Sequence, residues 1–171
     1  SMETKKLNPN QIVTLNDFPI YDKQALKNYF EAYKTNNETN IPLCPVIPSE
    51  IVIPYFDTTL SGKYQDFRRS HLKSEFFLLD GTHRTTAATL TKSPIGIIIF
   101  KEDKDILEAK KLTISRKILP SKVLDTNIKG NCKILKDHFT KKPHFQTVKE
   151  KTERMIRERV IDQYLIEYHN T

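Results

Sequence analysis

The sequence lacks tryptophan and has only two cysteines and four glycines in 171 residues. Two cysteines cannot build a disulfide framework. Cys44, Cys132, His138 and His144 show none of the spacings typical of zinc sites, so we expect no metal-ligand set. The longest apolar run, Ile95 to Phe100, is far shorter than the roughly 18 residues of a membrane span, and no apolar segment near the start is typical of a secretory signal. We therefore expect a cytoplasmic location and no membrane partner.

Charged residues are numerous and unevenly distributed along the chain. The formal net charge is +7. Residues 1–80 carry 9 Lys/Arg against 10 Asp/Glu, whereas residues 81–171 carry 19 against 11. A basic half favours a polyanionic partner, either nucleic acid or the phosphates of a nucleotide. The alternative is a solvated lysine surface that keeps the protein soluble.

Periodicity and proline positions predict alternating strands and helices, with polar, frayed residues at 1–6 and a polar loop at 57–75. We expect strands or extended segments at residues 11–15, 43–47, 51–55, 76–79 and 95–100, and helices at 23–34, 82–90, 104–117 and 147–169. This order predicts an α/β (α+β) fold with a small mixed sheet. We place one domain at residues 7–120 and a helical C-terminal extension at residues 121–171.

The stretch FFLLDGTHRTTAATL is the most informative part of the chain. It predicts an apolar strand, a glycine turn at Gly81 and a helix that starts at Thr82 or His83. The free N–H groups and the dipole of a helix N-terminus attract anions. Thr82, His83 and Arg84 add a hydroxyl, an imidazole and a guanidinium that can bind phosphate oxygens. Asp80 can accept from a ribose hydroxyl or hold a metal ion.

A plain strand–turn–helix junction is the alternative interpretation of this stretch. In that case Asp80 caps the helix, Arg84 pairs with a surface acid and His83 has no special role. A basic first turn opposes the helix dipole unless an anion is bound there. This mismatch favours a binding site over a plain junction.

The strand, the DGTHR turn and the alanine-rich helix resemble the signature of the ParB/sulfiredoxin superfamily. The resemblance extends over about residues 7–105, including IPLCPVIP as a middle strand and IGIIIF as the last strand. It implies a sheet of the ParB/sulfiredoxin type, in which the arginine-containing turn binds nucleotide phosphates.

Three branches of that superfamily can be compared at this turn. Sulfiredoxins have a cysteine where this chain has Thr82, so sulfinic-acid reduction is not expected. Chromosome-partition ParB proteins carry two arginines after an acid, bind CTP and have a helix-turn-helix domain, for which we find no pattern here. Free-serine kinases have an Asp-Gly-His-His-Arg turn, from which this chain departs only at Thr82. The kinase branch is therefore the nearest.

The kinase resemblance implies a phosphotransferase that uses ADP or ATP with Mg²⁺ on a small hydroxyl substrate such as free serine. Asp80, Gly81, Thr82, His83 and Arg84 are then the nucleotide-binding residues. The catalytic candidates are His83 and a carboxylate that orients the acceptor hydroxyl, for which the chain offers Asp17 or Asp22. We favour Asp17, because Asp22 is placed to cap a helix.

Two other functions stay open. The chain can be a ParB-like DNA-binding or nucleotide-switch protein that binds CTP or uses its basic second half, where Lys101 to Lys151 holds 14 Lys/Arg against 7 acids. It can also be a non-catalytic member of the fold. A second basic cluster, consisting of Arg68, Arg69, His71 and Lys73, precedes the strand at 76–79 and is a further candidate for contact with a nucleotide or nucleic acid.

Overall fold

The structure is a computed structural model that describes residues 2–16, 20–114 and 127–171. Its strands are β1 (Glu3–Leu7), β2 (Ile12–Thr14), β3 (Cys44–Pro48), β4 (Phe76–Leu78), β5 (Ile95–Ile99) and β6 (Gln146–Thr147). Its α-helices are α1 (Lys23–Lys34), α2 (Ser49–Val52), α3 (Thr58–Ser70), α4 (Thr82–Leu90), α5 (Asp103–Ile114), α6 (Ile128–Lys141), α7 (Val148–Arg157) and α8 (Gln163–His169). Short 3-10 helices occupy Pro9–Gln11, Glu38–Asn40 and Ile53–Tyr55.

The six strands form one mixed sheet in the order β1-β5-β3-β4-β2-β6. β3 is parallel to β5 and β2 is parallel to β4, whereas the other neighbouring pairs are antiparallel. The predicted α/β class with a mixed sheet is therefore confirmed.

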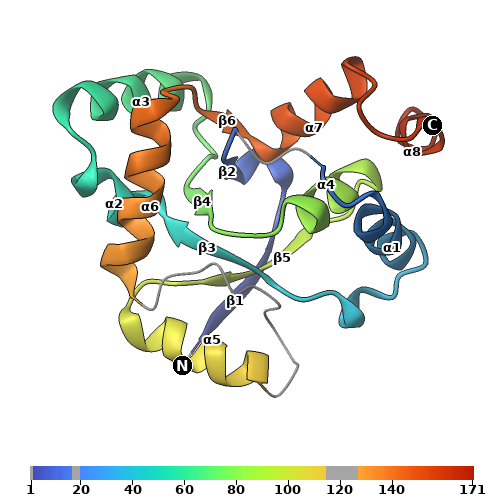
Figure 1. Cartoon of the computed structure of the whole chain (residues 1–171), viewed down its shortest axis with the longest axis horizontal. Coiled ribbons are helices and arrows are strands. Elements are labelled where there is room, and N and C mark those ends of the chain that lie inside the picture. The colour runs from blue at the N-terminus through green and yellow to red at the C-terminus, as the bar shows by residue number, and fades with distance from the viewer. Residues whose placement is uncertain (1, 17–19, 115–126) are drawn as a thin grey trace.

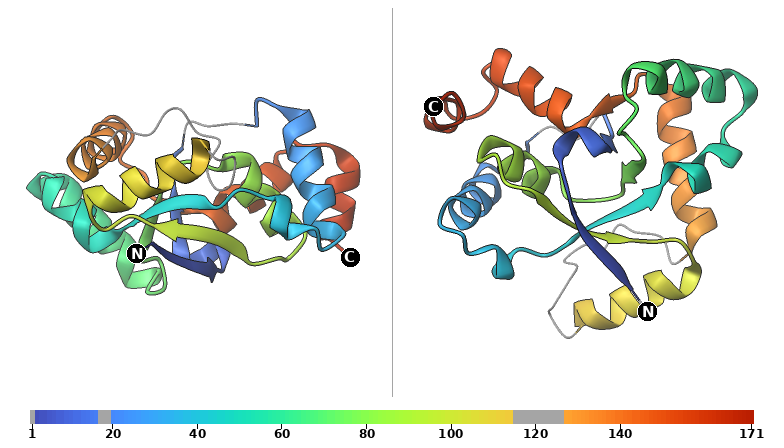
Figure 2. Two further views of the ribbon diagram at one scale, coloured as in Figure 1. Left: turned by 90° about the horizontal axis from the view of Figure 1, so that it is seen from below. Right: turned by 180° about the vertical axis from the view of Figure 1, so that it is seen from behind.

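Helices cover both faces of the sheet (Figures 1 and 2). One hydrophobic cluster joins the sheet to α1, α4, α7 and α8. A second cluster joins the sheet to α2, α3 and α6, and a smaller one lies between β5 and α5. β4 supplies both large clusters, because alternate side chains of a strand point to opposite faces. Phe76 and Leu78 pack on the first side and Phe77 packs on the second.

The topology brings two loops to one edge of the sheet. Ile12 pairs with Phe76 and Val13 with Phe77 in the parallel pair β2–β4. The carboxyl ends of the two strands therefore meet at the same edge. β4 leads there into the DGTHR turn and α4, and β2 leads into the loop toward α1.

Residues 127–171 are integrated into this fold. β6 extends the sheet beside β2, α6 packs on the second cluster, and α7 and α8 pack on the first. The domain boundary predicted at residue 120 lies outside the described residues. The single helix predicted over 147–169 is wrong, because Arg159 adopts a positive φ of 54° between α7 and α8. This reversal returns Leu165 and Ile166 to the core.

Three other sequence predictions are corrected by the structure. The residues predicted to fray at 1–6 include β1, which pairs along its whole length with β5. The loop predicted at 57–75 contains α3, which Asp57 caps by accepting the Leu60 N–H and which buries Leu60 and Tyr64. The extended segment predicted at 51–55 is α2 followed by a 3-10 turn. The helix predicted at 104–117 is found as α5, and its last three residues lie outside the described part of the chain.

Within the described ranges, no helix has both the length and the apolar composition needed to cross a membrane.

Candidate functional site

Gly81 joins β4 to α4 in a conformation that other residues rarely adopt. Its φ is 120° and its ψ is 33°, and it is the N-cap residue of α4. A Cβ at this position would lie 2.8 Å from Sγ of the buried Cys44 and 3.3 Å from its Cβ. Both the backbone angle and the lack of space therefore require glycine here.

The helix that follows begins without a side-chain cap. Gly81 offers no side-chain acceptor, and the first turn of α4 contains no acidic residue. The first N–H that bonds back within the helix is that of Thr85, which donates to the Gly81 carbonyl at 2.8 Å. The N–H groups of Thr82, His83 and Arg84 therefore have no acceptor in their own helix. Such a helix end favours an anion.

Arg84 is almost completely buried, with 3% of its surface exposed. Its Nη2 donates to Oδ2 of Asp80 at 3.0 Å, and its Nη1 donates to the carbonyls of Leu43 at 2.8 Å and Pro42 at 3.2 Å. The guanidinium thus joins the DGTHR turn to the segment that enters β3. These contacts make Arg84 a positioning residue for Asp80, and its direct contact with phosphate stays a prediction.

His83 is held by the backbone that precedes α1. Its Nε2 accepts the Asp22 N–H at 3.2 Å, and its side chain is 8% exposed. Burial lowers the pKa of His83, although the nearby Asp22 carboxylate acts in the opposite direction. A neutral imidazole that accepts at Nε2 carries its proton on Nδ1. That Nδ1–H has no acceptor among the residues that the structure describes, so His83 is suited to donate to a ligand.

The structure describes only one of the two candidate carboxylates, Asp22. Asp22 caps α1, since its Oδ1 accepts the Ala25 N–H at 2.9 Å, as the sequence predicted. Asp17 lies outside the described residues, and its catalytic role stays a prediction.

Lys151 is a candidate site residue that sequence reasoning missed. It belongs to α7, is 4% exposed, and its Nζ donates to the Leu15 carbonyl at 3.0 Å. Its charge is close enough to His83 to contribute to the lowered pKa of that imidazole. A signal was present in the sequence, because Lys151 falls on the apolar side of α7 together with Val148 and Met155.

A magnesium ion fits this site only together with a phosphate ligand. No group of three or more His, Cys, Asp or Glu side chains gathers in the described ranges. Mg²⁺ is usually held by one or two carboxylates and by the phosphates of the substrate. Asp80, whose side chain is 30% exposed and held through one oxygen by Arg84, is the carboxylate suited to that role.

The second predicted basic cluster lies at the opposite end of β4, where α3 ends. Arg68 donates to two backbone carbonyls of the following turn, at 2.9 and 3.1 Å. Arg69 pairs with the Asp66 carboxylate at 2.6 Å, and His71 contacts Glu150 at 3.0 Å. These contacts tie the end of α3 to its own turn and to α7, so this cluster is not at the DGTHR site.

No protein-family model, curated protein or solved structure matches this chain.

Proposed function

We propose that the chain binds the phosphates of a nucleotide at the N-terminus of α4 and transfers a phosphoryl group to a small hydroxyl substrate. The observation that supports this most directly is the first turn of α4. It begins at a glycine without a side-chain cap, contains no acid and carries two basic side chains. A bound anion would accept from its free N–H groups, and the helix dipole favours negative charge at this end.

The donors around this turn can be assigned to a phosphate chain. The backbone N–H groups of Thr82 and His83, the Thr82 hydroxyl and the His83 Nδ1–H are the neutral donors. Lys151 adds a positive charge at the same edge of the sheet. Fixed donors of this kind stabilise the charge that spreads over the transferred phosphoryl group.

Asp80 is the described carboxylate that fits the remaining role. Arg84 fixes one of its oxygens at 3.0 Å, so the carboxylate is held at the start of the helix. There it can contact Mg²⁺ on the nucleotide or the hydroxyl of the acceptor. The resemblance to free-serine kinases suggests serine as the acceptor and Asp17 as the carboxylate that orients it.

The binding step is tested by titrating ADP, ATP and CTP with Mg²⁺ into the wild-type protein and into Thr82→Val. Hydrogen bonds to charged groups contribute about 1.5–3 kcal/mol, so we expect Thr82→Val to weaken nucleotide binding about tenfold or more. Thr91→Val is the matched control, since Thr91 is at the C-terminal end of the same helix and its hydroxyl bonds to Ala87 and Ala88 carbonyls. Absence of binding in the wild type, by calorimetry and by thermal shift, would show that the turn is a structural junction. Binding of CTP alone would favour the partition-protein branch.

The transfer step needs a separate assay. We expect ADP or ATP with Mg²⁺ and serine to yield phosphoserine, and Asp80→Asn to reduce the rate more than it reduces nucleotide binding. If the protein binds a nucleotide but transfers no phosphoryl group to any small hydroxyl compound, the proposed kinase activity is wrong and the proposed nucleotide binding stands.

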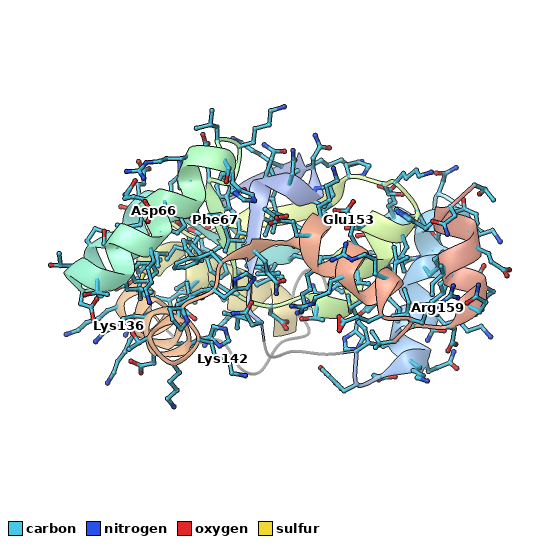
Figure 3. All side chains as sticks on the ribbon, turned by 90° about the horizontal axis from the view of Figure 1, so that it is seen from above. Asp66, Phe67, Lys136, Lys142, Glu153 and Arg159 are labelled. Atoms are coloured by element: carbon cyan, nitrogen blue, oxygen red, sulfur yellow. The ribbon has the colours of Figure 1, made fainter. Side chains whose placement is uncertain are left out.

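Nucleic-acid binding is a second candidate, supported by the outer side of α6. Lysines recur there at helical spacing, with Asp137 as the only acid of the helix: Lys129, Lys133, Lys136 and Lys141. None of the four has an ion pair within the described part of the chain, and Lys136 lies on the outer surface in Figure 3. Such a row can contact successive backbone phosphates.

This candidate predicts DNA binding that weakens steeply as salt is raised. Lys133→Glu combined with Lys136→Glu should abolish a gel shift at low salt, whereas Lys27→Glu on α1 should leave it unchanged. No shift of the wild-type protein at low salt would remove this function.

A further inference from the structure

Tyr21 is the most exposed large hydrophobic side chain among the described residues, with 76% of its surface accessible. It lies next to the proposed phosphate site. Its ring is perpendicular to that of His83, with 4.6 Å between the ring centroids. The other exposed tyrosines, Tyr164 at 41% and Tyr55 at 37%, are more covered.

The ring is held near α4 by its own backbone. The N–H of the next residue, Asp22, donates to Nε2 of His83 at 3.2 Å, and the Asp22 carboxylate caps α1. The backbone on the C-terminal side of Tyr21 is thus fixed to the first turn of one helix and to the start of another. An aromatic ring at a fixed backbone position can offer a flat apolar surface without a large loss of conformational freedom.

His83 and Tyr21, which lie beside each other, each leave a group that a ligand could contact. The Nδ1–H of His83, a side chain that is 8% exposed, has no acceptor. Most of Tyr21 is left to solvent, and its one aromatic contact within the described residues is with His83. A ligand that satisfies both must carry an anionic oxygen and a flat apolar group a short distance apart. A nucleotide has this construction, because a ribose joins its base to its phosphates.

We propose that Tyr21 is the stacking surface for the base of the bound nucleotide. This inference rests on the proposed function and adds the substrate class, a nucleoside diphosphate or triphosphate instead of an inorganic polyphosphate or a sugar phosphate. Stacking on an aromatic ring uses the π-face that every base has. Purine nucleotides therefore bind more tightly than pyrimidine nucleotides through their larger face, with little discrimination between adenine and guanine.

The test measures binding of Mg-ADP and Mg-pyrophosphate by calorimetry to wild type, Tyr21→Leu and Tyr21→Phe. Removal of a stacking ring weakens binding by about 5- to 150-fold, so we expect a loss in this range for ADP with Tyr21→Leu. Tyr21→Phe keeps the ring and should bind ADP within about twofold of wild type on the same grounds. Pyrophosphate affinity should be the same in all three proteins. Tyr164→Leu on α8 is the control for an exposed tyrosine away from the site.

The outcomes separate this inference from the proposed function. If wild type binds pyrophosphate as tightly as ADP, or if Tyr21→Leu weakens both ligands equally, the stacking role is overturned and the phosphate site remains. The same loss with Tyr164→Leu also overturns it. If wild type binds neither ligand, the phosphate site and the stacking role are both wrong. Tyr21 is largely exposed, so the unfolding temperature of Tyr21→Leu should match that of wild type and exclude misfolding as the cause.

Discussion

The two ends of β4 carry basic clusters that look alike in the sequence and differ in the structure. At the amino end, Arg68 donates to two backbone carbonyls and Arg69 forms an ion pair in which both side chains are more than two-thirds exposed. At the carboxyl end, Arg84 is 3% exposed and joins Asp80 to the entry of β3. Arg68 and Arg84 both fix the backbone by donating to carbonyls, but only Arg84 does so in the core.

The difference shows that a run of basic residues is a weak indicator of a site. The amino-end cluster contacts its own turn, Asp66 and Glu150, although the buried Nε of Arg68 has no hydrogen-bond partner within the described residues. The carboxyl end gathers several such donors at one place, namely the N–H groups at the start of α4 and the Nδ1–H of His83, which have no acceptors in the described structure. Several donors without acceptors that converge on one helix end point to a ligand more strongly than charge or a single such donor does.

Arg84→Ala should produce the largest loss of stability. It leaves the half-buried Asp80 carboxylate and two carbonyls without their donor, and breaking a buried pair costs about 3–5 kcal/mol. Arg68→Ala removes the donor from two neutral backbone carbonyls at a partly exposed position. We expect this change to lower the free energy of unfolding by about 1 kcal/mol. Urea denaturation of both variants measures the difference. Equal losses would contradict the distinction between the two ends.

Gly81→Ala should be the next largest effect. Alanine is strained at a φ of 120°, and its Cβ would lie 2.8 Å from Sγ of Cys44, so we expect a loss of about 2 kcal/mol or more. Gly62→Ala in the middle of α3 is the control, because no atom other than those of its chain neighbours and its own helix backbone lies within 4 Å of its Cβ position. That change should stabilise the protein by about 0.5–1 kcal/mol. In a double-mutant cycle, Cys44→Ala should relieve only the steric part of the Gly81→Ala loss.

The buried His83 at the carboxyl end should make the free energy of unfolding depend on pH. Its pKa is lowered in the folded state by burial, so below pH 6.5 the unfolded chain binds a proton that the folded chain does not. The contribution of His83 is therefore fully present above pH 6.5 and is lost as the pH falls toward its folded pKa, with a slope of at most about 1.4 kcal/mol per pH unit. His83→Gln should flatten this part of the stability curve, whereas His144→Gln, at an exposed position, should not. An unchanged slope in His83→Gln would show that other groups produce it.

The local parts of this molecule could be predicted from the sequence, and the parts that depend on distant residues could not. The run of apolar residues, the glycine turn and the alanine-rich helix at residues 76–90 are encoded by neighbours, so the β4–α4 junction was found. The cap of α1 by Asp22 is equally local. The acceptors of Arg84 are not, because they come from residues 41 and 42 positions earlier in the chain. Lys151 meets Leu15 across 136 positions, and no local pattern indicates that pairing.

The missed elements have the same physical origin. The sequence of α3 is rich in Ser, Thr and Gly, which are weak helix formers, and its helix depends on burying Leu60 and Tyr64 against the sheet. β1 is mostly charged and forms because β5 offers it a complete ladder. In both cases tertiary packing outweighs the local preference.

The smallest expected effect concerns Arg69 at the amino end of β4. Its ion pair with Asp66 is short, at 2.6 Å, but the side chains are 78% and 68% exposed. Water screens such a pair and its two long side chains lose rotational freedom, so we expect Arg69→Ala to lower the free energy of unfolding by less than about 0.5 kcal/mol. The difference from wild type should disappear in 1 M salt, where the screening length is about 3 Å. A loss above about 1 kcal/mol that persists at this salt concentration exceeds the range of exposed pairs, and it would mean that the amino-end cluster shares in the core of the fold as Arg84 does.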